Sequence, residues 1–146
     1  MAKIKFIFIL LILFSLKSFA QDWQTNFDKA KKIASTNNHN IVLVFQGSDW
    51  CAPCIKLDRE IWSTQEFKNL AKEHFVLLQA DFPKRKKNKL STEHQQHNNA
   101  LAKKYNPNGY FPYVVVLKAN GETLGSIGYE KTTPELFFKK LRAFEN

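Results

Sequence analysis

The chain has 146 residues, which suits one domain, and its formal net charge is +9 at pH 7. That charge permits attraction to acidic partners or anionic surfaces. No stretch resembles a module that reads nucleic acid, so we expect no nucleic-acid partner.

The N-terminal segment has the pattern of a secretory signal peptide. Lysines within 1–5 give a basic start, the block 6–16 is apolar, and 18–20 have a small-x-small pattern. A membrane span needs roughly 20 apolar residues, so an uncleaved membrane anchor is the less favoured alternative. We therefore expect a signal peptide at 1–20, a single domain at 21–146, and export to the periplasm with only transient membrane contact.

The first half of the expected domain alternates helical and strand patterns. Apolar residues at helical spacing predict an amphipathic helix over 22–38. The run 41–45 is continuously apolar and β-branched, which is expected of a central strand covered on both faces. A helix is predicted over 51–61. The capping-box pattern of Ser63 and Glu66, with Ser63 as the N-cap, then opens a second helical segment to about residue 74.

The middle of the chain contains a strand pattern over 75–81 and a helical pattern over 92–105. Between them, the segment 84–89 carries five positive charges in six residues. Charge runs resist burial, so we expect an exposed, solvated loop, with a docking surface as the alternative.

The last part of the chain predicts a hairpin and a helix. A strand over 114–117, an Asn-Gly turn signal and a return strand over 123–129 form the hairpin. Thr132 or Thr133 is expected to cap the final helix, with Pro134 in its first turn. Its expected buried stripe consists of Leu136, Phe137, Leu141 and Phe144.

This order of elements, α-β-α-β-α-β-β-α, predicts an α/β fold. Its core would be a mixed four-stranded sheet flanked by helices on both faces. The first two strands, which a helix joins, should run parallel with a right-handed crossover. The last two should form an antiparallel pair.

The two cysteines of the chain both lie in Cys51-Ala52-Pro53-Cys54, after the first predicted strand. Helical residues three apart are near neighbours, within the span of a disulfide. At the first helical turn, free N–H groups and the helix dipole favour a thiolate, which makes Cys51 the expected nucleophile. Cys54, one turn later and expected to be more buried, would resolve the intermediate. A disulfide that closes so short a loop adds little stability, so the pair indicates a redox site.

Pro53 falls in the first turn of this helix, where its missing N–H costs little. The surrounding residues resemble the thioredoxin family. An apolar strand leads into Trp50-Cys51-Ala52-Pro53-Cys54, and Phe111-Pro112-Tyr113 precedes the hairpin strands. The similarity extends over essentially all of 21–146 and is strongest to exported thioredoxin-like proteins and to periplasmic reductase domains of transmembrane electron carriers. It implies a thioredoxin-like fold and protein disulfide oxidoreductase activity that needs no cofactor besides the cysteine pair.

The resemblance also implies a role for each residue of the site. Cys51 would attack a substrate disulfide, and Cys54 would resolve the mixed disulfide. Pro112 would be a cis-proline beside the cysteines, and Phe111 would offer backbone groups to the substrate chain. Trp50 would shield the site. The alternatives are an ordinary trans Pro112 at the start of a strand and a core position for Trp50.

The sequence departs from the family pattern near the cysteines. Phe45 stands where many thioredoxins bury an aspartate that helps to move the proton of the second thiol. Asp58, seven residues after Cys51, is a candidate substitute that resembles the acid found there in some reductase domains. A solvated helix residue is the alternative for Asp58. Ala52 takes the place of the glycine that is usual in thioredoxin.

The leading hypothesis is an exported, monomeric thiol–disulfide oxidoreductase that reduces or isomerises disulfides in protein substrates and is recycled by an unidentified electron donor. The proline before Cys54 favours a reductase. A metal-binding or metal-delivery protein is the second hypothesis, because cysteines are soft ligands and His94 and His97 place two imidazoles on adjacent helix turns. The spacings do not match usual zinc sites, so we expect no metal. A redox-silent binding protein with the same fold is the third hypothesis.

Overall fold

The computed structural model describes residues 22–146, so the predicted signal peptide lies outside the described residues. Its strands are β1 (Asn40–Gln46), β2 (Phe75–Asp81), β3 (Tyr113–Leu117) and β4 (Thr123–Gly128). Its helices are α1 (Phe27–Asn37), α2 (Ala52–Leu57), the π-helical η1 (Asp58–Trp62), α3 (Gln65–Ala71), the 3-10 turn η2 (Lys86–Asn88), α4 (Thr92–Tyr105) and α5 (Pro134–Ala143). No helix within 22–146 is long and apolar enough to span a membrane.

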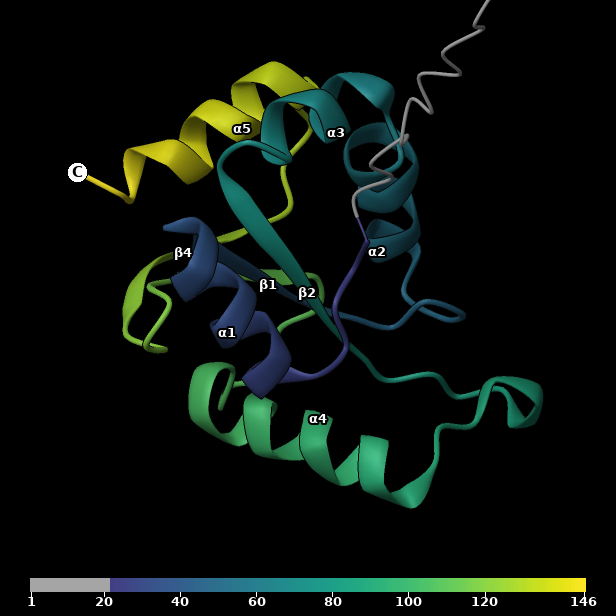
Figure 1. Ribbon diagram of the computed structural model, residues 1–146. Helices are drawn as coiled ribbons and strands as arrows, with labels where there is room; N and C mark the ends of the chain where they lie inside the picture. The colour runs from purple at the N-terminus through teal and green to yellow at the C-terminus, as the bar shows by residue number, and fades with distance from the viewer. Residues whose placement is uncertain (1–21) are drawn as a thin grey trace, which may run out of the picture.

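The four strands form one mixed sheet in the order β2-β1-β3-β4. The pair β1 and β2 runs parallel, whereas β1 with β3 and β3 with β4 are antiparallel. This arrangement confirms the predicted α/β fold, including the parallel first pair and the final hairpin. Helices cover both faces of the sheet (Figure 1).

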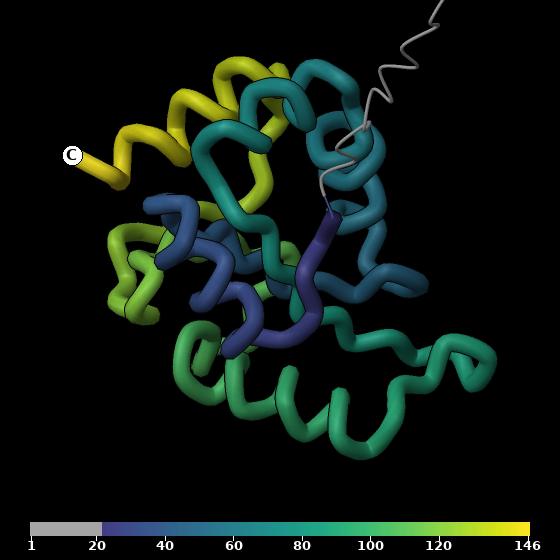
Figure 2. Tube along the Cα trace, viewed as in Figure 1, coloured from purple at the N-terminus to yellow at the C-terminus, as the bar shows by residue number. Residues whose placement is uncertain are grey.

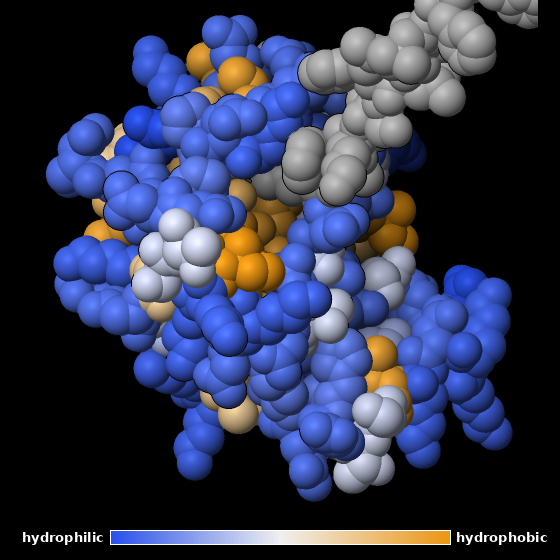
Figure 3. Space-filling view, viewed as in Figure 1, coloured by the Kyte–Doolittle hydropathy of each residue, from blue (hydrophilic) through white to orange (hydrophobic). Residues whose placement is uncertain are grey.

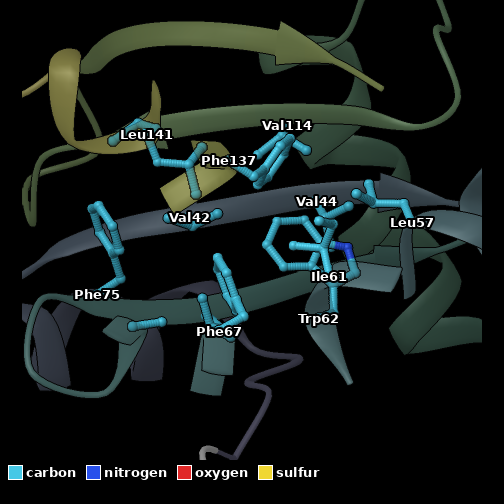
Figure 4. Close-up of a cluster of buried hydrophobic side chains, with 13 residues drawn as sticks. Val42, Val44, Leu57, Ile61, Trp62, Phe67, Phe75, Val114, Phe137 and Leu141 are labelled. Atoms are coloured by element: carbon cyan, nitrogen blue, oxygen red, sulfur yellow. The ribbon is translucent and has the colours of Figure 1, made fainter. Parts of the chain in front are cut away.

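Each face of the sheet carries its own apolar core. Because successive side chains of a strand point to opposite faces, Val42 and Val44 of β1 join one core while Leu43 and Phe45 join the other. The first core lies under α2, η1, α3 and α5, and Figure 4 shows its aromatic and aliphatic side chains converging. The second core lies under α1 and α4. The continuous apolar run at 41–45 is therefore explained by burial on both faces.

The first helix begins later than predicted. Its N-cap is Asn26, whose side chain accepts a hydrogen bond from the Lys29 N–H. The preceding residues instead extend along β2, where Gln24 forms a parallel bridge with Leu78, and Figure 2 shows this purple segment beside the teal strand. The backbone of Gln24 is satisfied by hydrogen bonds with Leu77 and Gln79 of β2. The first residues of the range 22–38, Trp23 included, therefore do not belong to the helix, although Trp23 has helical spacing to the later apolar residues.

Two further predictions about helices were wrong. Thr64, not Ser63, caps α3 by accepting a hydrogen bond from the Phe67 N–H, while the Ser63 hydroxyl donates to the Asp58 carboxylate. In α5, Thr133 is the cap as expected, but Leu136 is 51% exposed. Leu136 neighbours the buried Phe137 and so lies about 100° around the helix from it, on the solvent side.

Candidate active site

The two cysteines form a disulfide at the junction of β1 and α2, with 5.2 Å between their Cα atoms. Cys51 is the N-cap residue of α2, and its Sγ lies 3.3 Å from the backbone N of Cys54, whose N–H it accepts. Pro53 occupies the first turn of the helix, as predicted. In this oxidised form Cys51 is 4% and Cys54 3% exposed. Cys54 is therefore only marginally more buried than Cys51, so in the oxidised form burial hardly distinguishes the two cysteines.

The turn before Cys51 is anchored to the end of β2. The backbone N–H of Cys51 donates to the Gly47 carbonyl at 2.9 Å. Ser48 donates twice to the Asp81 carboxylate, from its backbone N at 2.9 Å and from its hydroxyl at 2.6 Å. Since Asp81 ends β2 beside Gln46 of β1, two neighbouring strand ends determine the position of the cysteine-bearing turn.

Trp50 lies on the surface of this turn, 38% exposed. Its indole N–H donates to the carbonyl of Phe82 at 2.7 Å, and its ring meets that of Phe111 edge to face, with centroids 5.6 Å apart. Phe111 makes a similar contact with Phe82 at 5.5 Å. Trp50 is therefore held over the turn at the site surface and is not a core residue.

The peptide bond between Phe111 and Pro112 is cis. Tyr113, the next residue, begins β3 opposite Phe45 at the end of β1. Because Phe111 contacts Trp50, the cis-proline segment lies beside the turn that carries Cys51. The roles of Phe111 and Pro112 in binding a substrate chain stay predictions.

A cavity of about 250 Å³ adjoins Cys54. Asp58 lines it together with Gln46 and Gln79, whose side chains are hydrogen-bonded to each other at 3.1 Å. Asp58 thus shares a polar cavity with the second cysteine, although its role in proton transfer stays a prediction. Phe45, by contrast, is fully buried in the core under α1 and α4, so apolar packing takes the place of the family's buried aspartate.

Sequence reasoning missed Asp49 as part of the site. Its carboxylate accepts hydrogen bonds at 2.9 Å from the backbone N–H groups of Lys84 and Arg85 and from the side-chain amide of Asn88. These donors, the Lys84 N–H foremost, lower the pKa of Asp49 from 3.8 to about 2. The sequence shows that Asp49 lies close to the cysteines. No pattern of neighbouring residues predicts that the fold brings Asp49 next to residues 84–88.

Two exposed apolar residues, one beside Cys54 and one at the start of the cis-proline segment, were also missed. Ile55, 45% exposed, lines the cavity beside Cys54. Tyr110, 56% exposed, immediately precedes Phe111. With Trp50, they are three of the four large apolar side chains that are exposed within 22–146. Exposed apolar side chains on the cysteine turn, beside Cys54 and next to the cis-proline segment suit contact with a polypeptide.

His97 of α4 is hydrogen-bonded to other residues of the protein. His97 Nε2 accepts the backbone N–H of Phe27 at 3.0 Å, and its Nδ1 lies 3.0 Å from the Asn98 side-chain oxygen. His97 therefore connects α4 to the start of α1. The residues 22–146 contain no group of three or more histidine, cysteine or acidic side chains that could hold a metal ion.

Gly47 is required by the close approach of Trp50. A Cβ at this position would lie 2.6 Å from Cζ2 of the Trp50 ring and nearer still to two other ring atoms. We expect Gly47→Ala to displace the indole and lower the free energy of unfolding by about 1–3 kcal/mol, as overpacking does. Denaturant unfolding of the oxidised protein measures this loss.

The matched control for Gly47 is Gly128→Ala, since among residues 22–146 no atom beyond its own chain neighbours lies within 4 Å of the added Cβ. That variant should be neutral or stabilised by up to about 1 kcal/mol. Equal unfolding free energies for the two variants would show that the Trp50 position does not depend on Gly47.

Comparison with known proteins agrees with this geometry. A family profile described as Thioredoxin-like matches residues 22–119. The protein named Disulfide bond reductase DsbH, from Chlamydia pneumoniae, is 32% identical over 121 residues, which are 83% of this chain and 70% of that protein.

Solved structures show the same similarity. The DsbH Oxidoreductase structure matches with a TM-score of 0.77 and 30% identity over 84% of this chain and 83% of that one. A thioredoxin from Thermus thermophilus matches with a TM-score of 0.59 at 19% identity, over 83% and 84% of the two chains, which shows the fold alone. The chain, in which Cys51 and Cys54 form a CXXC disulfide, is thus a homologue of a disulfide bond reductase, and it belongs to the thioredoxin-like family.

Proposed function

We propose that this protein is an exported, periplasmic thiol–disulfide oxidoreductase that reduces disulfides in protein substrates. The disulfide between Cys51 and Cys54 at the start of α2 is the main observation in favour of this function. The exposed apolar residues around it and the cis-proline segment beside it offer a surface for a substrate chain. The relative named disulfide bond reductase supports the reducing direction.

The reaction begins from the reduced Cys51–Cys54 pair. The Cys51 thiolate attacks one sulfur of the substrate disulfide, a new S–S bond forms, and the second substrate sulfur leaves as a thiolate that takes up a proton. The Cys54 thiol then loses its proton and attacks Cys51 Sγ, which releases the first substrate sulfur as a thiol. Overall, two electrons and two protons pass to the substrate, and the protein becomes the disulfide.

The residues around the pair have distinct roles in this scheme. The Cys54 N–H that Cys51 accepts in the oxidised form would also stabilise the Cys51 thiolate. Asp58, an exposed residue that lines the same cavity as Cys54, would receive the proton of the second thiol, which would make it a proton-transfer residue. Phe111 would offer backbone groups to the substrate chain.

Recycling requires a further electron donor. After each turnover the Cys51–Cys54 disulfide must be reduced again by a thiol or dithiol reductant, which in an oxidising compartment must be supplied by another protein. The protein is proposed to act as a monomer and without any bound cofactor.

The reduction potential of the Cys51–Cys54 pair tests this proposal directly. The protein is equilibrated against glutathione buffers of known ratio, and the oxidised fraction is determined by trapping free thiols. A reductase should have a reduction potential close to that of thioredoxin, about −270 mV. A strong disulfide oxidant has a reduction potential of about −120 mV. The Cys51→Ser/Cys54→Ser variant is the control, and it should not react with the thiol-trapping reagent at any glutathione ratio.

Each outcome has a clear meaning. A potential close to that of the oxidant would replace reduction by oxidation or isomerisation as the function. A pair that does not exchange with glutathione at all would overturn the enzyme function altogether.

A further inference from the structure

The segment 84–89 between β2 and α4, which we call the basic loop, carries five exposed cationic side chains: Lys84, Arg85, Lys86, Lys87 and Lys89. Among the residues 22–146, none of the five forms an ion pair with a carboxylate. The loop projects from the body of the fold (Figure 1), and the corresponding projection is coloured hydrophilic in Figure 3. Its charge is therefore available to a partner.

The basic loop is bound to the turn that carries the nucleophile. Asp49 accepts three hydrogen bonds from it, two from the backbone at its start and one from Asn88 near its end. The Lys84 ammonium lies over the Trp50 ring, 3.8 Å from the centroid. Asp49 and Trp50 immediately precede Cys51, so the loop has a defined position relative to the reactive sulfur.

The lysines of the basic loop lie in and next to a short 3-10 turn. The backbone of the loop closes a 3-10 turn, in which the N–H of Asn88 donates to the Arg85 carbonyl and that of Lys89 to the Lys86 carbonyl. Lys86 and Lys87 lie in that turn and Lys89 directly follows it. The Asp49 carboxylate accepts its hydrogen bonds from N–H groups of the loop and interacts electrostatically with Arg85. Within residues 22–146 it forms no ion pair with Lys86, Lys87 or Lys89.

We propose that the basic loop is a docking surface for acidic polypeptide, so that the protein prefers disulfides with aspartate or glutamate nearby in the substrate chain. This inference rests on the proposed function. A chain that reaches Cys51 across the exposed Trp50 passes directly beside the loop, and opposite charge there accelerates encounter and holds the complex. An anionic membrane is the less favoured partner, because the charges gather in six residues next to the reactive turn and do not form a broad face.

The test compares two synthetic peptides with the same intramolecular disulfide, one flanked by glutamates and one by glutamines. The reduced protein is mixed with each peptide, and the second-order rate of peptide reduction is measured at low and high salt. Neutral hydroxyethyl disulfide serves as a third substrate without charged flanks. We expect the wild type to reduce the glutamate peptide about tenfold faster at low salt, with the difference shrinking as salt screens the charges.

The diagnostic variant is Lys86→Gln/Lys87→Gln/Lys89→Gln. It removes three charges but leaves the backbone and Asn88 contacts to Asp49 and the contact of Lys84 with Trp50. The matched control is Lys29→Gln/Lys32→Gln/Lys103→Gln, which removes three exposed charges from α1 and α4. The first variant should lose most of the preference, and the control should retain it.

The results can overturn the inference in several distinct ways. It is wrong if the loop variant keeps the preference, if the wild type has none, or if the loop variant slows equally on all three substrates, which would indicate a structural role. It is also wrong if the variant loses only binding to phosphatidylglycerol vesicles, because the partner would then be a membrane. Normal reduction of hydroxyethyl disulfide by the wild-type protein leaves the proposed function intact in each of these cases, whereas a wild type that reacts with no disulfide overturns both proposals.

Discussion

Replacing Cys51 by serine should abolish disulfide reduction, with a rate loss of roughly a thousandfold or more, because the attacking sulfur is removed. Replacing Cys54 by serine should have a different result. The first exchange should still occur, but no second thiol remains to release the substrate. We expect the Cys54→Ser protein to accumulate one mixed disulfide per chain, which intact-mass measurement of the unreduced mixture detects.

These two variants are well matched because serine keeps the local structure. Cys51 caps α2 with its side-chain atom, and serine is among the best N-cap residues, so helix α2 should still form. Both cysteines are almost equally buried in the oxidised form, so burial does not distinguish them, whereas the position at the helix start does. A mixed disulfide that forms through Cys54 in the Cys51→Ser variant would reverse the assignment of nucleophile and resolving thiol.

The arrangement of the strands could be predicted because apolar patterns report burial directly. The continuous run over 41–45 became the central strand β1, and 75–81 became β2 with the same bounds as predicted. The start of the first helix could not be predicted, since Gln24 bonds to a strand edge more than fifty residues away. Such a contact leaves no trace in the local spacing of residues.

In the candidate site, too, the residues within one motif could be predicted, and a contact between distant segments could not. Cys51 and Cys54 were found because the motif is contiguous and its chemistry follows from spacing alone. Asp49 was missed because its partners at 84–88 come from a different segment. The sequence showed a basic loop, and it also showed an acid before the cysteines. Only the fold brings the two together and turns a solvated charge run into part of the site surface.

The second large effect concerns Trp62, which lies at the end of η1, the helical turn that continues α2 from Cys54. Its ring is 2% exposed and meets those of Trp23, Phe67 and Phe137 edge to face, with centroids 5.4, 4.9 and 5.3 Å away. Figure 4 shows it among the side chains of the larger core. Trp62→Ala should lower the free energy of unfolding by about 3–5 kcal/mol, as emptying a buried aromatic site does.

Trp62→Phe should cost much less, about 1 kcal/mol, for a specific reason. The indole N–H of Trp62 is buried without a hydrogen-bond partner among the described residues, and such a group carries a penalty of about 1–3 kcal/mol. Phenylalanine removes that penalty but also loses part of the buried ring area, so the gain offsets only part of the loss. Denaturant unfolding of the oxidised proteins measures both variants, with Leu136→Ala on the exposed side of α5 as a control expected to stay within about 0.5 kcal/mol. If Trp62→Phe lowered the free energy of unfolding as much as Trp62→Ala, the stability of the core would depend on the exact shape of the indole. It would then not follow from the apolar area that the side chain buries.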